Sequence, residues 1–365
     1  MYTKTFKNEK ISGLGLGGLR FPVDPDNPNH INRTKSREIV DTAMEWGINY
    51  FDTAYTYQNG DSERFLGEVL SAYPRESYYF ATKFYGSPGK KIEIVFEEQM
   101  RRCGMEYFDF YLLHSMDENH IDDYMDREKG YLEYLLRQKE KGRIRYLGFS
   151  SHGAPKTLKR FLDWYDGFDM ALIQLNYLDW TLLQAKEQYE ILSSRQIPVW
   201  VMEPLKGGRL CKLNQEAENL LKGAAPDRSI ESWAFRFLMG LPNVQTVLSG
   251  MSSAEQVREN AAAFAKIDPL NPKEKEILEK AGHAFIKDLG VPCSGCRYCC
   301  DTCPAQLDIP LLLQSYNEKR ISGDTWRLEG LSKIKGADQC LQCGTCVTHC
   351  PQKIDIPAVM KKLKG

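Results

Sequence analysis

The chain has 365 residues, and its 48 Lys and Arg against 49 Asp and Glu leave a net charge of −1. A composition of 42% hydrophobic and 27% charged residues is typical of globular proteins and excludes a disordered chain, a coiled coil or a collagen-like fibre. The near-zero charge argues against nucleic acid or a membrane surface as a partner. The first residues lack the apolar stretch of a secretory signal, and no apolar run approaches the roughly 18 residues of a membrane span, so we expect a cytoplasmic protein.

Short apolar runs alternate with amphipathic stretches over the first 265 residues. The predicted strands cover residues 11–16, 48–52, 79–82, 108–113, 146–149, 170–175, 197–202 and 244–248. The predicted helices cover residues 35–46, 62–70, 90–103, 127–141, 155–164, 187–194, 229–238 and 253–265. This alternation indicates parallel βα units, and their number favours a closed (β/α)8 TIM barrel over an open doubly wound sheet. Residues 3–10 are predicted to form a hairpin that closes the bottom of the barrel.

The glycines near the start match a dinucleotide-binding pattern by spacing alone. Gly13, Gly15 and Gly18 read G-x-G-x-x-G. That fingerprint requires a helix directly after the glycines, with its N-terminus at the pyrophosphate. Here Pro22 and Pro25 follow instead, so we do not predict a Rossmann site.

The composition and the predicted elements change after the predicted barrel. We expect a barrel domain over residues 1–265, a linker and helix over 266–290, and a small, mainly helical domain over 291–365, with helices at 311–319 and 326–334. Nine of the 11 cysteines lie in this last part. An odd cysteine count in a chain without a secretory signal argues for metal ligation rather than a disulfide framework.

The cysteine-rich part contains a duplicated motif, C-x2-C-x2-C-x3-C-P, followed in both copies by Asp-Ile-Pro. In two-cluster ferredoxins, the fourth Cys of such a motif binds the cluster held by the other copy. The implied ligand sets for two [4Fe-4S] clusters are Cys293, Cys296 and Cys299 with Cys350, and Cys340, Cys343 and Cys346 with Cys303. Zinc, the alternative, would take four thiolates and leave half of them unused. Cys300 aligns with Val347 and is not an expected ligand. This region resembles the helical two-cluster ferredoxin domains of multidomain oxidoreductases.

A polar residue lies at or next to the carboxyl end of five successive predicted strands of the barrel. These residues are Asp52, Lys83, His114, Ser150 and Gln174. Functional residues of such barrels lie at the carboxyl ends of the strands. One polar strand end is commonly a loop cap, but five in succession are harder to explain, because burying each is unfavourable unless it is paired.

Tyr57, just after Asp52, is the candidate general acid or base. A tyrosine with a pKa of about 10 is poor in this role at neutral pH. A buried Lys83 ammonium would lower the pKa of Tyr57, and Asp52 would keep that lysine charged. His114 can hydrogen-bond a carbonyl oxygen. These four residues predict protonation of a carbonyl while hydride arrives at its carbon.

The segments around these residues resemble the signatures of the aldo-keto reductase family. They are Phe51-Asp52-Thr53-Ala54-Tyr55-Thr56-Tyr57, Thr82-Lys83, Leu112-Leu113-His114-Ser115, Gly148-Phe149-Ser150-Ser151 and Ile173-Gln174-Leu175-Asn176. With its tail, the chain resembles the subgroup that carries a C-terminal two-cluster [4Fe-4S] ferredoxin domain. The resemblance implies an oxidoreductase that interconverts a carbonyl and an alcohol by hydride transfer with NAD(H) or NADP(H).

The resemblance also implies a nicotinamide bound in extended form across the barrel mouth. Ser150, Ser151 and Gln174 would hold the carboxamide, with Gly17 and Gly18 beside the ring. Ser151 stands where the family commonly has Asn.

For the rest of the cofactor, the resemblance implies contacts from two further segments. Leu205, Gly207 and Gly208 would approach the pyrophosphate. Glu259 and Asn260 would approach the adenine.

Two departures from the family pattern affect cofactor binding. Met202-Glu203 replaces the aromatic residue that stacks on the nicotinamide. Gly250, Met251 and Gln256 replace the Lys, Ser or Thr, and Arg that grip the 2′-phosphate of NADP, so the charge that a phosphate needs is missing there. The choice between NAD and NADP stays open.

Two other functions stay open as alternatives. One is a ferredoxin-linked electron-transfer enzyme, although clusters pass single electrons, hydride carries two, and the chain has no flavin motif. The other is a nucleotide-binding redox sensor without turnover, against which the intact set of four residues argues. The clusters would serve electron relay or docking, so a ferredoxin-like partner is a further expectation. The loop 115–126 favours a polar substrate, although any exposed loop would have its composition.

Overall fold

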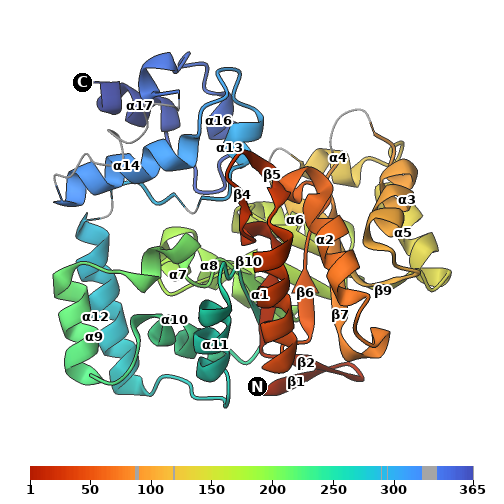
Figure 1. Ribbon diagram of the computed structural model, residues 1–365, viewed down its shortest axis with the longest axis horizontal. Helices are drawn as coiled ribbons and strands as arrows, with labels where there is room; N and C mark the ends of the chain where they lie inside the picture. Colours follow the sequence, from red (N-terminus) through yellow and green to blue (C-terminus); the bar gives the residue numbers. More distant parts are fainter. Residues whose placement is uncertain (87–89, 118–119, 289, 294, 323–334, 365) are drawn as a thin grey trace. The chain divides into compact units, whose positions relative to one another are not determined.

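A computed structural model describes residues 1–86, 90–117, 120–288, 290–293, 295–322 and 335–364 (Figure 1). Eight parallel strands close into a barrel, which confirms the predicted fold. The strands are β3 (Leu14–Gly17), β6 (Tyr50–Asp52), β7 (Tyr79–Phe84), β8 (Phe108–Met116), β9 (Ile144–Ser151), β10 (Met170–Gln174), β11 (Val199–Met202) and β12 (Val244–Ser249). The barrel closes where β12 pairs with β3, with Leu248 opposite Gly15.

The eight helices predicted within residues 1–265 are all present, with ends shifted by a few residues. They are α1 (Arg33–Glu45), α2 (Asp61–Leu70), α3 (Ile92–Cys103), α5 (Tyr131–Glu140), α6 (Pro155–Trp164), α8 (Ala185–Ser194), α10 (Ile230–Met239) and α11 (Ala254–Ala263). Among the described residues of the first 265, the structure adds three helices that we did not predict: α4 (Ile121–Met125), α7 (Asp179–Leu182) and α9 (Gln215–Ala224). The first two are too short to show a helical period.

The segment after β3 agrees with our rejection of a Rossmann site. The short turn η1 (Gly18–Arg20) follows the glycines, and the hairpin of β4 (Val23–Asp24) and β5 (Asn27–Ile31) comes next. The α-helix that the fingerprint requires directly after the glycines is therefore replaced by a short turn and a hairpin.

The N-terminal hairpin fills one end of the barrel. It consists of β1 (Thr3–Phe6) and β2 (Glu9–Ser12), so the prediction of a single strand over 11–16 is wrong. The chain passes from one sheet to the other at Gly13, where a Cβ would lie 2.3 Å from the Tyr2 ring. Phe6 packs against the rings of Phe110, Tyr146 and Trp200, with centroids 4.9–5.7 Å apart. The hairpin thus closes the bottom as predicted.

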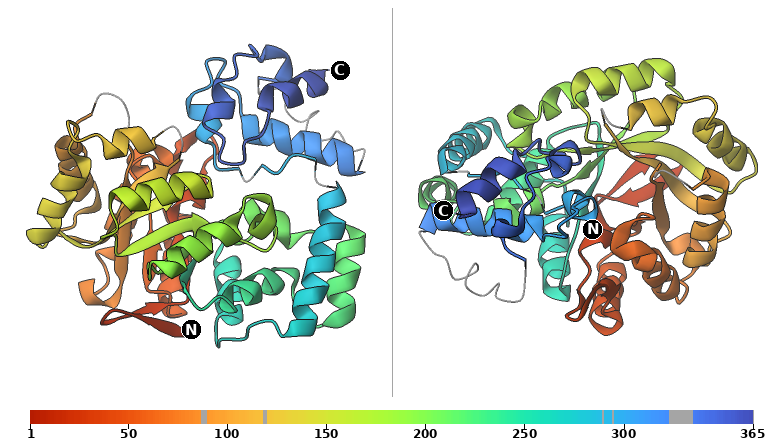
Figure 2. Two further views of the ribbon diagram at one scale, coloured as in Figure 1. Left: turned by 180° about the vertical axis from the view of Figure 1, so that it is seen from behind. Right: turned by 90° about the horizontal axis from the view of Figure 1, so that it is seen from above.

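The chain divides into two compact units, one of Met1–Pro204 with Ala234–Leu270, and one of Leu205–Trp233 with Asn271–Gly365. Helix α9 packs against α12 (Pro272–Asp288) in the second unit, as both views of Figure 2 show. Asn214, at the start of α9, donates to the Ala284 carbonyl at 3.0 Å. The predicted boundary at 265 leaves α9 in the barrel domain, whereas its contacts place it in the second unit. The sequence carries no sign of the α9–α12 contact.

The remainder of the second unit is mainly helical, as predicted. Its helices are α13 (Tyr298–Asp301), α14 (Ile309–Ser322), α16 (Thr345–Thr348) and α17 (Ile356–Lys364). The helix predicted at 326–334 lies outside the described residues. None of the described helices is long and apolar enough to cross a membrane.

Candidate active site and cluster site

The five polar strand ends lie at one end of the barrel, because all its strands run in parallel. Each is at most 5% exposed: Asp52, Lys83, His114, Ser150 and Gln174. The register of the paired strands sets the spacing of these residues. Asp52 on β6 lies opposite Gly17 on β3 and opposite Ala81 on β7.

Lys83 is the centre of this group. Its ammonium donates to Asp52 Oδ1 at 2.5 Å and to the Thr53 carbonyl at 2.7 Å. It also lies 3.4 Å from the hydroxyl of Tyr57, which begins a short turn after β6. The structure therefore brings Asp52, Lys83 and Tyr57 together.

Burial and charge act against each other on these groups. Burial would lower the pKa of the Lys83 ammonium, but the charges and hydrogen bonds of Asp52 and Tyr57 together outweigh it, and the pKa of Lys83 is raised. Burial raises the pKa of Tyr57, and Lys83 offsets this only in part. The net direction is thus opposite to the lowering that we expected, because the phenolate loses more by leaving water than Lys83 restores. At neutral pH, Tyr57 carries its proton.

His114 lies between two tyrosines. Its ring centroid is 5.8 Å from that of Tyr57 and 5.9 Å from that of Tyr85, both in edge contacts. Burial, and then the charge of Lys83, hold the pKa of His114 well below its usual range. Its neutral imidazole has one N–H, which suits it to donate to a carbonyl oxygen.

A buried network behind the site escaped the sequence analysis. Glu63, which is fully buried, accepts from Thr82 Oγ1 at 2.7 Å and from Gln99 Nε2 at 2.6 Å. Gln99 also donates to the Lys83 carbonyl at 3.1 Å, and Arg102 pairs with Glu63 at 3.2 Å. Glu63 and Gln99 lie on helices, where polar side chains commonly face solvent, so nothing in the sequence pointed to them.

Ser150 and Gln174 offer one donor and one acceptor from neighbouring strands. The Ser150 hydroxyl oxygen accepts from the Ser115 backbone N–H at 2.8 Å, so its own proton remains for donation. The Gln174 Nε2 donates to Asp179 at 2.8 Å, so its carbonyl oxygen is the side-chain atom suited to accept. This pair is complementary to a primary amide.

The other residues predicted to lie near the nicotinamide differ in their local contacts. Ser151 Oγ accepts from the Gly153 N–H at 3.2 Å, within its own loop. A Cβ at Gly18 would lie 3.0 Å from the Asp52 carbonyl, so that position requires glycine. At Gly17 the same atom would meet only ordinary contacts of 3.7 Å or more.

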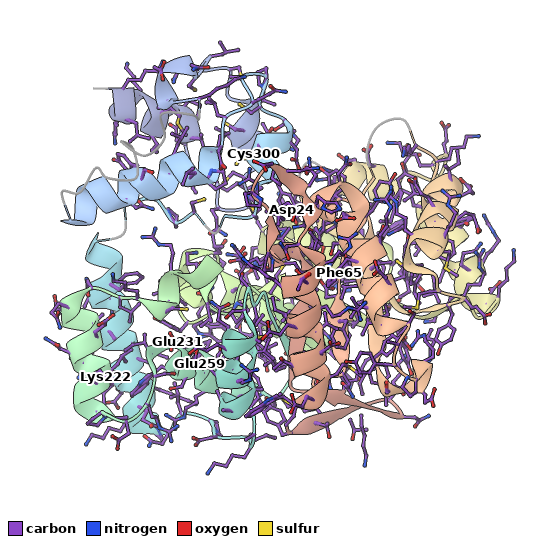
Figure 3. The ribbon with its side chains drawn as sticks, in the orientation of Figure 1. Asp24, Phe65, Lys222, Glu231, Glu259 and Cys300 are labelled. Carbon is purple, nitrogen blue, oxygen red and sulfur yellow. The ribbon has the colours of Figure 1, made fainter. Side chains whose placement is uncertain are left out.

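At the predicted adenine end, the structure reveals a cationic residue that we missed. Glu259, labelled in Figure 3, is exposed on α11, and Asn260 Nδ2 donates to Ser249 Oγ at 3.3 Å. The aliphatic part of Arg20 packs on Gly250, 3.0 Å from where a Cβ would stand. Arg20 follows β3 and Gly250 follows β12, so the pairing that closes the barrel brings them together.

The segment after β11 continues from the barrel into the second unit. Met202 packs against the apolar core of the barrel, and the charge of Glu203 contributes to raising the pKa of Tyr57. Leu205, Gly207 and Gly208 belong to the second unit.

One residue of that segment contacts the cysteine-rich region. Lys206 is fully buried, and its ammonium donates to Gln352 Oε1 at 3.0 Å. Gln352 comes two residues after Cys350. The segment predicted to approach a pyrophosphate therefore touches the second repeat.

Four cysteines line one pocket in the second unit. They are Cys303, Cys340, Cys343 and Cys346. Apolar side chains complete the wall, among them Leu307, Ile309, Ile356 and Met360. These four thiols are one predicted ligand set, including the cysteine from the other repeat, and their chemistry fits an iron–sulfur cluster.

The structure brings together part of the other predicted ligand set, which consists of Cys293, Cys296, Cys299 and Cys350. A hydrogen bond with Cys300, burial, and the neighbouring Cys296 and Cys293 all raise the pKa of Cys299. Cys350 is buried in the same apolar core as Cys299. Within the described part of the chain, no three His, Cys, Asp or Glu side chains are arranged to hold a single metal ion.

Each part of the chain matches a known protein family. The family model for the aldo/keto reductase family matches residues 13–282, and that for a 4Fe-4S dicluster domain matches residues 292–354. The uncharacterized oxidoreductase YqkF of Bacillus subtilis is 28% identical, over 69% of this chain and 87% of its own. The NADH-specific methylglyoxal reductase of Escherichia coli is 25% identical, over 70% and 90%. The holo structure of an aldo-keto reductase from Bacillus halodurans, 27% identical, covers 77% of this chain and 96% of its own with a TM-score of 0.64. The chain is therefore an oxidoreductase of the aldo/keto reductase family that also carries a 4Fe-4S dicluster domain.

Proposed function

We propose that this oxidoreductase interconverts a small carbonyl compound and its alcohol, with Tyr57 as the general acid or base. The observation that carries the proposal is the row of buried Asp52 and Lys83 with half-buried Tyr57, and neutral His114 against the Tyr57 ring. Bound NAD(H) or NADP(H) would supply the hydride.

Each of the four residues has one task in this proposal. His114 donates its N–H to the carbonyl oxygen and so fixes the substrate. Tyr57 gives its proton to the same oxygen as negative charge develops there. The Lys83 ammonium stabilises the phenolate that remains, and Asp52 keeps Lys83 charged. In the oxidation direction the same groups act in reverse.

The donor and acceptor of Ser150 and Gln174 suit a nicotinamide carboxamide. We assign Ser151, Gly17, Gly18 and Met202 to the surroundings of the ring. Leu205, Gly207 and Gly208 would hold the pyrophosphate, and Glu259 and Asn260 the adenine. The similar Escherichia coli reductase is NADH-specific by name, which favours NADH here too.

We further propose that the cysteines hold two [4Fe-4S] clusters for electron relay or for docking of a ferredoxin-like partner. The pocket lined by Cys303 and three cysteines of the second repeat supports this assignment. The contact from Lys206 to Gln352 supports a connection between the nucleotide segment and the cluster domain.

The first prediction concerns Tyr57. Tyr57→Phe removes the proton donor while keeping the ring, so we expect kcat for aldehyde reduction to fall about 10²–10⁴-fold. The dissociation constant of NADH, measured by fluorescence, should stay within about twofold, since Tyr57 is not assigned to the nucleotide. The matched control is Tyr73→Phe, whose hydroxyl binds Asp41 on the helical layer. Near-normal kcat in Tyr57→Phe would contradict the assignment.

The second prediction concerns nucleotide choice. Because Gly250, Met251 and Gln256 bring no cation, NADH should bind at least as tightly as NADPH. Titration of both against the cofactor-free protein measures this directly. A clear preference of the wild type for NADPH would contradict this expectation. If Arg20→Ala then abolishes that preference, Arg20 supplies the missing charge.

The third prediction concerns the clusters. Protein prepared without oxygen should contain about eight iron atoms per chain and a brown chromophore that dithionite bleaches. Cys303→Ala and Cys350→Ala should each lose about four iron atoms, from the cluster of the opposite repeat. Cys300→Ser, the control, should keep its iron. Zinc at about two ions per chain without iron would exclude iron–sulfur clusters.

A further inference from the structure

One of the two predicted cluster sites has a ligand at the protein surface. All eight predicted cysteine ligands lie among the described residues, and Cys343 is the exposed one, whereas the others are buried or half-buried. Leu341, two residues before Cys343, is 65% exposed and lines the same pocket. A single exposed leucine is ordinary on a protein surface. Its place between two cluster ligands, Cys340 and Cys343, gives a partner an apolar contact directly beside the cluster site.

Two lysine ammonium groups lie at the wall of this pocket. Lys335 Nζ donates to the Ala305 carbonyl at 3.0 Å, and Lys364 Nζ donates to the Cys340 carbonyl at 3.4 Å. Ala305 and Cys340 both line the pocket. Ala305 follows the first cysteine repeat and Cys340 begins the second, so separate segments of the wall each hold a cation.

The chain around this pocket is positively charged, although the whole protein is not. Residues 335–364 carry five lysines against two aspartates, a net charge of +3 with histidine counted as neutral, in a chain of net charge −1. All five of these lysines are exposed. We refer to the exposed side chains of Leu341, Lys335, Lys361, Lys362 and Lys364 as the docking face.

The lysines of α17 also suit the helix itself. Lys361, Lys362 and Lys364 lie in its last turn, where positive charge interacts favourably with the helix dipole. That role does not account for Lys335, which lies outside α17, or for the exposed Leu341. It would also leave the association with another protein independent of these charges, so association is the readout that separates the two roles.

We propose that an acidic iron–sulfur protein of the ferredoxin type binds to the docking face and exchanges electrons with the cluster held by Cys303, Cys340, Cys343 and Cys346. The inference rests on the proposed function, in which these cysteines hold a cluster. The lysines attract the partner, and Leu341 supplies the apolar contact at the centre of a polar interface. One electron crosses in each encounter: one centre is oxidised by one electron and the other is reduced by one, with no bond made or broken.

The position of the face favours a redox protein over other anionic partners. Lysines would also attract nucleic acid or an anionic membrane. Neither of these would use a cluster ligand at the middle of the contact, whereas electron exchange requires the partner to approach the cluster closely. Interfaces between electron-transfer proteins are commonly small, so one exposed apolar side chain with flanking lysines suits this kind of contact.

The full-length protein, prepared without oxygen, tests the proposal with a plant-type [2Fe-2S] ferredoxin as the acidic probe. Titration gives the dissociation constant, and stopped-flow absorbance gives the second-order rate constant of electron exchange in whichever direction proceeds. We expect the rate constant to fall about tenfold or more between about 50 and 500 mM NaCl, because salt screens the attraction between the two proteins.

Charge reversal on the docking face gives the decisive variant. Lys361→Glu with Lys362→Glu leaves the contacts of Lys335 and Lys364 with the pocket wall in place. It should lower the rate constant about tenfold at low salt and flatten its salt dependence. Replacing both lysines by Arg should keep the wild-type rate constant. The matched control is Lys280→Glu, an exposed lysine on α12 of the same unit, which should leave the rate constant unchanged.

Iron content, measured on every variant, separates loss of the cluster from loss of docking. If the double Glu variant binds less iron, the milder Lys361→Gln with Lys362→Gln is used, and its rate constant should fall about threefold. Three results overturn the inference and leave the proposed function intact: an unchanged rate constant in the iron-loaded variants, equal exchange with basic cytochrome c, or binding of duplex DNA or phosphatidylserine vesicles but not of ferredoxin. A wild-type protein that takes up no iron overturns the proposed clusters and this inference with them.

Discussion

A lysine ammonium that is 1% exposed can remain charged only beside an anion, and the polar end of the barrel is arranged around this requirement. Strand β6 brings Asp52 and strand β7 brings Lys83, and their parallel pairing places the two side chains 2.5 Å apart. The charge then acts on the neighbours: it opposes the rise that burial causes in the pKa of Tyr57 and helps to hold His114 neutral. One ion pair thus acts on the pKa of both groups that would meet a carbonyl oxygen, while burial has the larger effect on each.

The backbone around Lys83 is fixed as firmly as its side chain. Gln99 holds the Lys83 carbonyl, and the Glu63 carboxylate binds both Gln99 and Thr82. A buried, satisfied network of this kind specifies one arrangement, because breaking any member leaves a polar group without its partner. On the other side, Tyr124 ties β7 to β8. Hydrogen bonds therefore fix the backbone of β7 and β8, the strands that carry Lys83 and His114.

The second unit depends on a different constraint. Its core combines cysteines with aliphatic side chains from short helices, and the repeat spacing decides which thiols meet. Since cluster binding would be coupled to the folding of such a domain, we expect metal loss to destabilise it. The segment 205–233 belongs to this unit rather than to the barrel that its position in the sequence suggests.

The sequence predicted the barrel and its polar strand ends well, because parallel strands alternate with amphipathic helices and place their carboxyl ends together. It failed where a contact joins distant residues. Arg20 meets Gly250 only through barrel closure, and Glu63 meets Gln99 only through helix packing. It also gave the net pKa direction of Tyr57 wrongly, since the degree of burial is not visible in a motif. Helix α9 went unpredicted, and its partner α12 lies some fifty residues further along the chain.

The pH dependence of kcat/KM for aldehyde reduction, compared between the wild type and Lys83→Met, tests the central claim most directly. Reduction requires the protonated phenol, so activity falls as pH rises through the pKa of Tyr57. Without the ammonium, burial still raises that pKa and nothing offsets it, so the fall should move to higher pH while the maximal rate drops. A fall at the same pH in both proteins, or at lower pH in Lys83→Met, would contradict the role assigned to the buried ion pair.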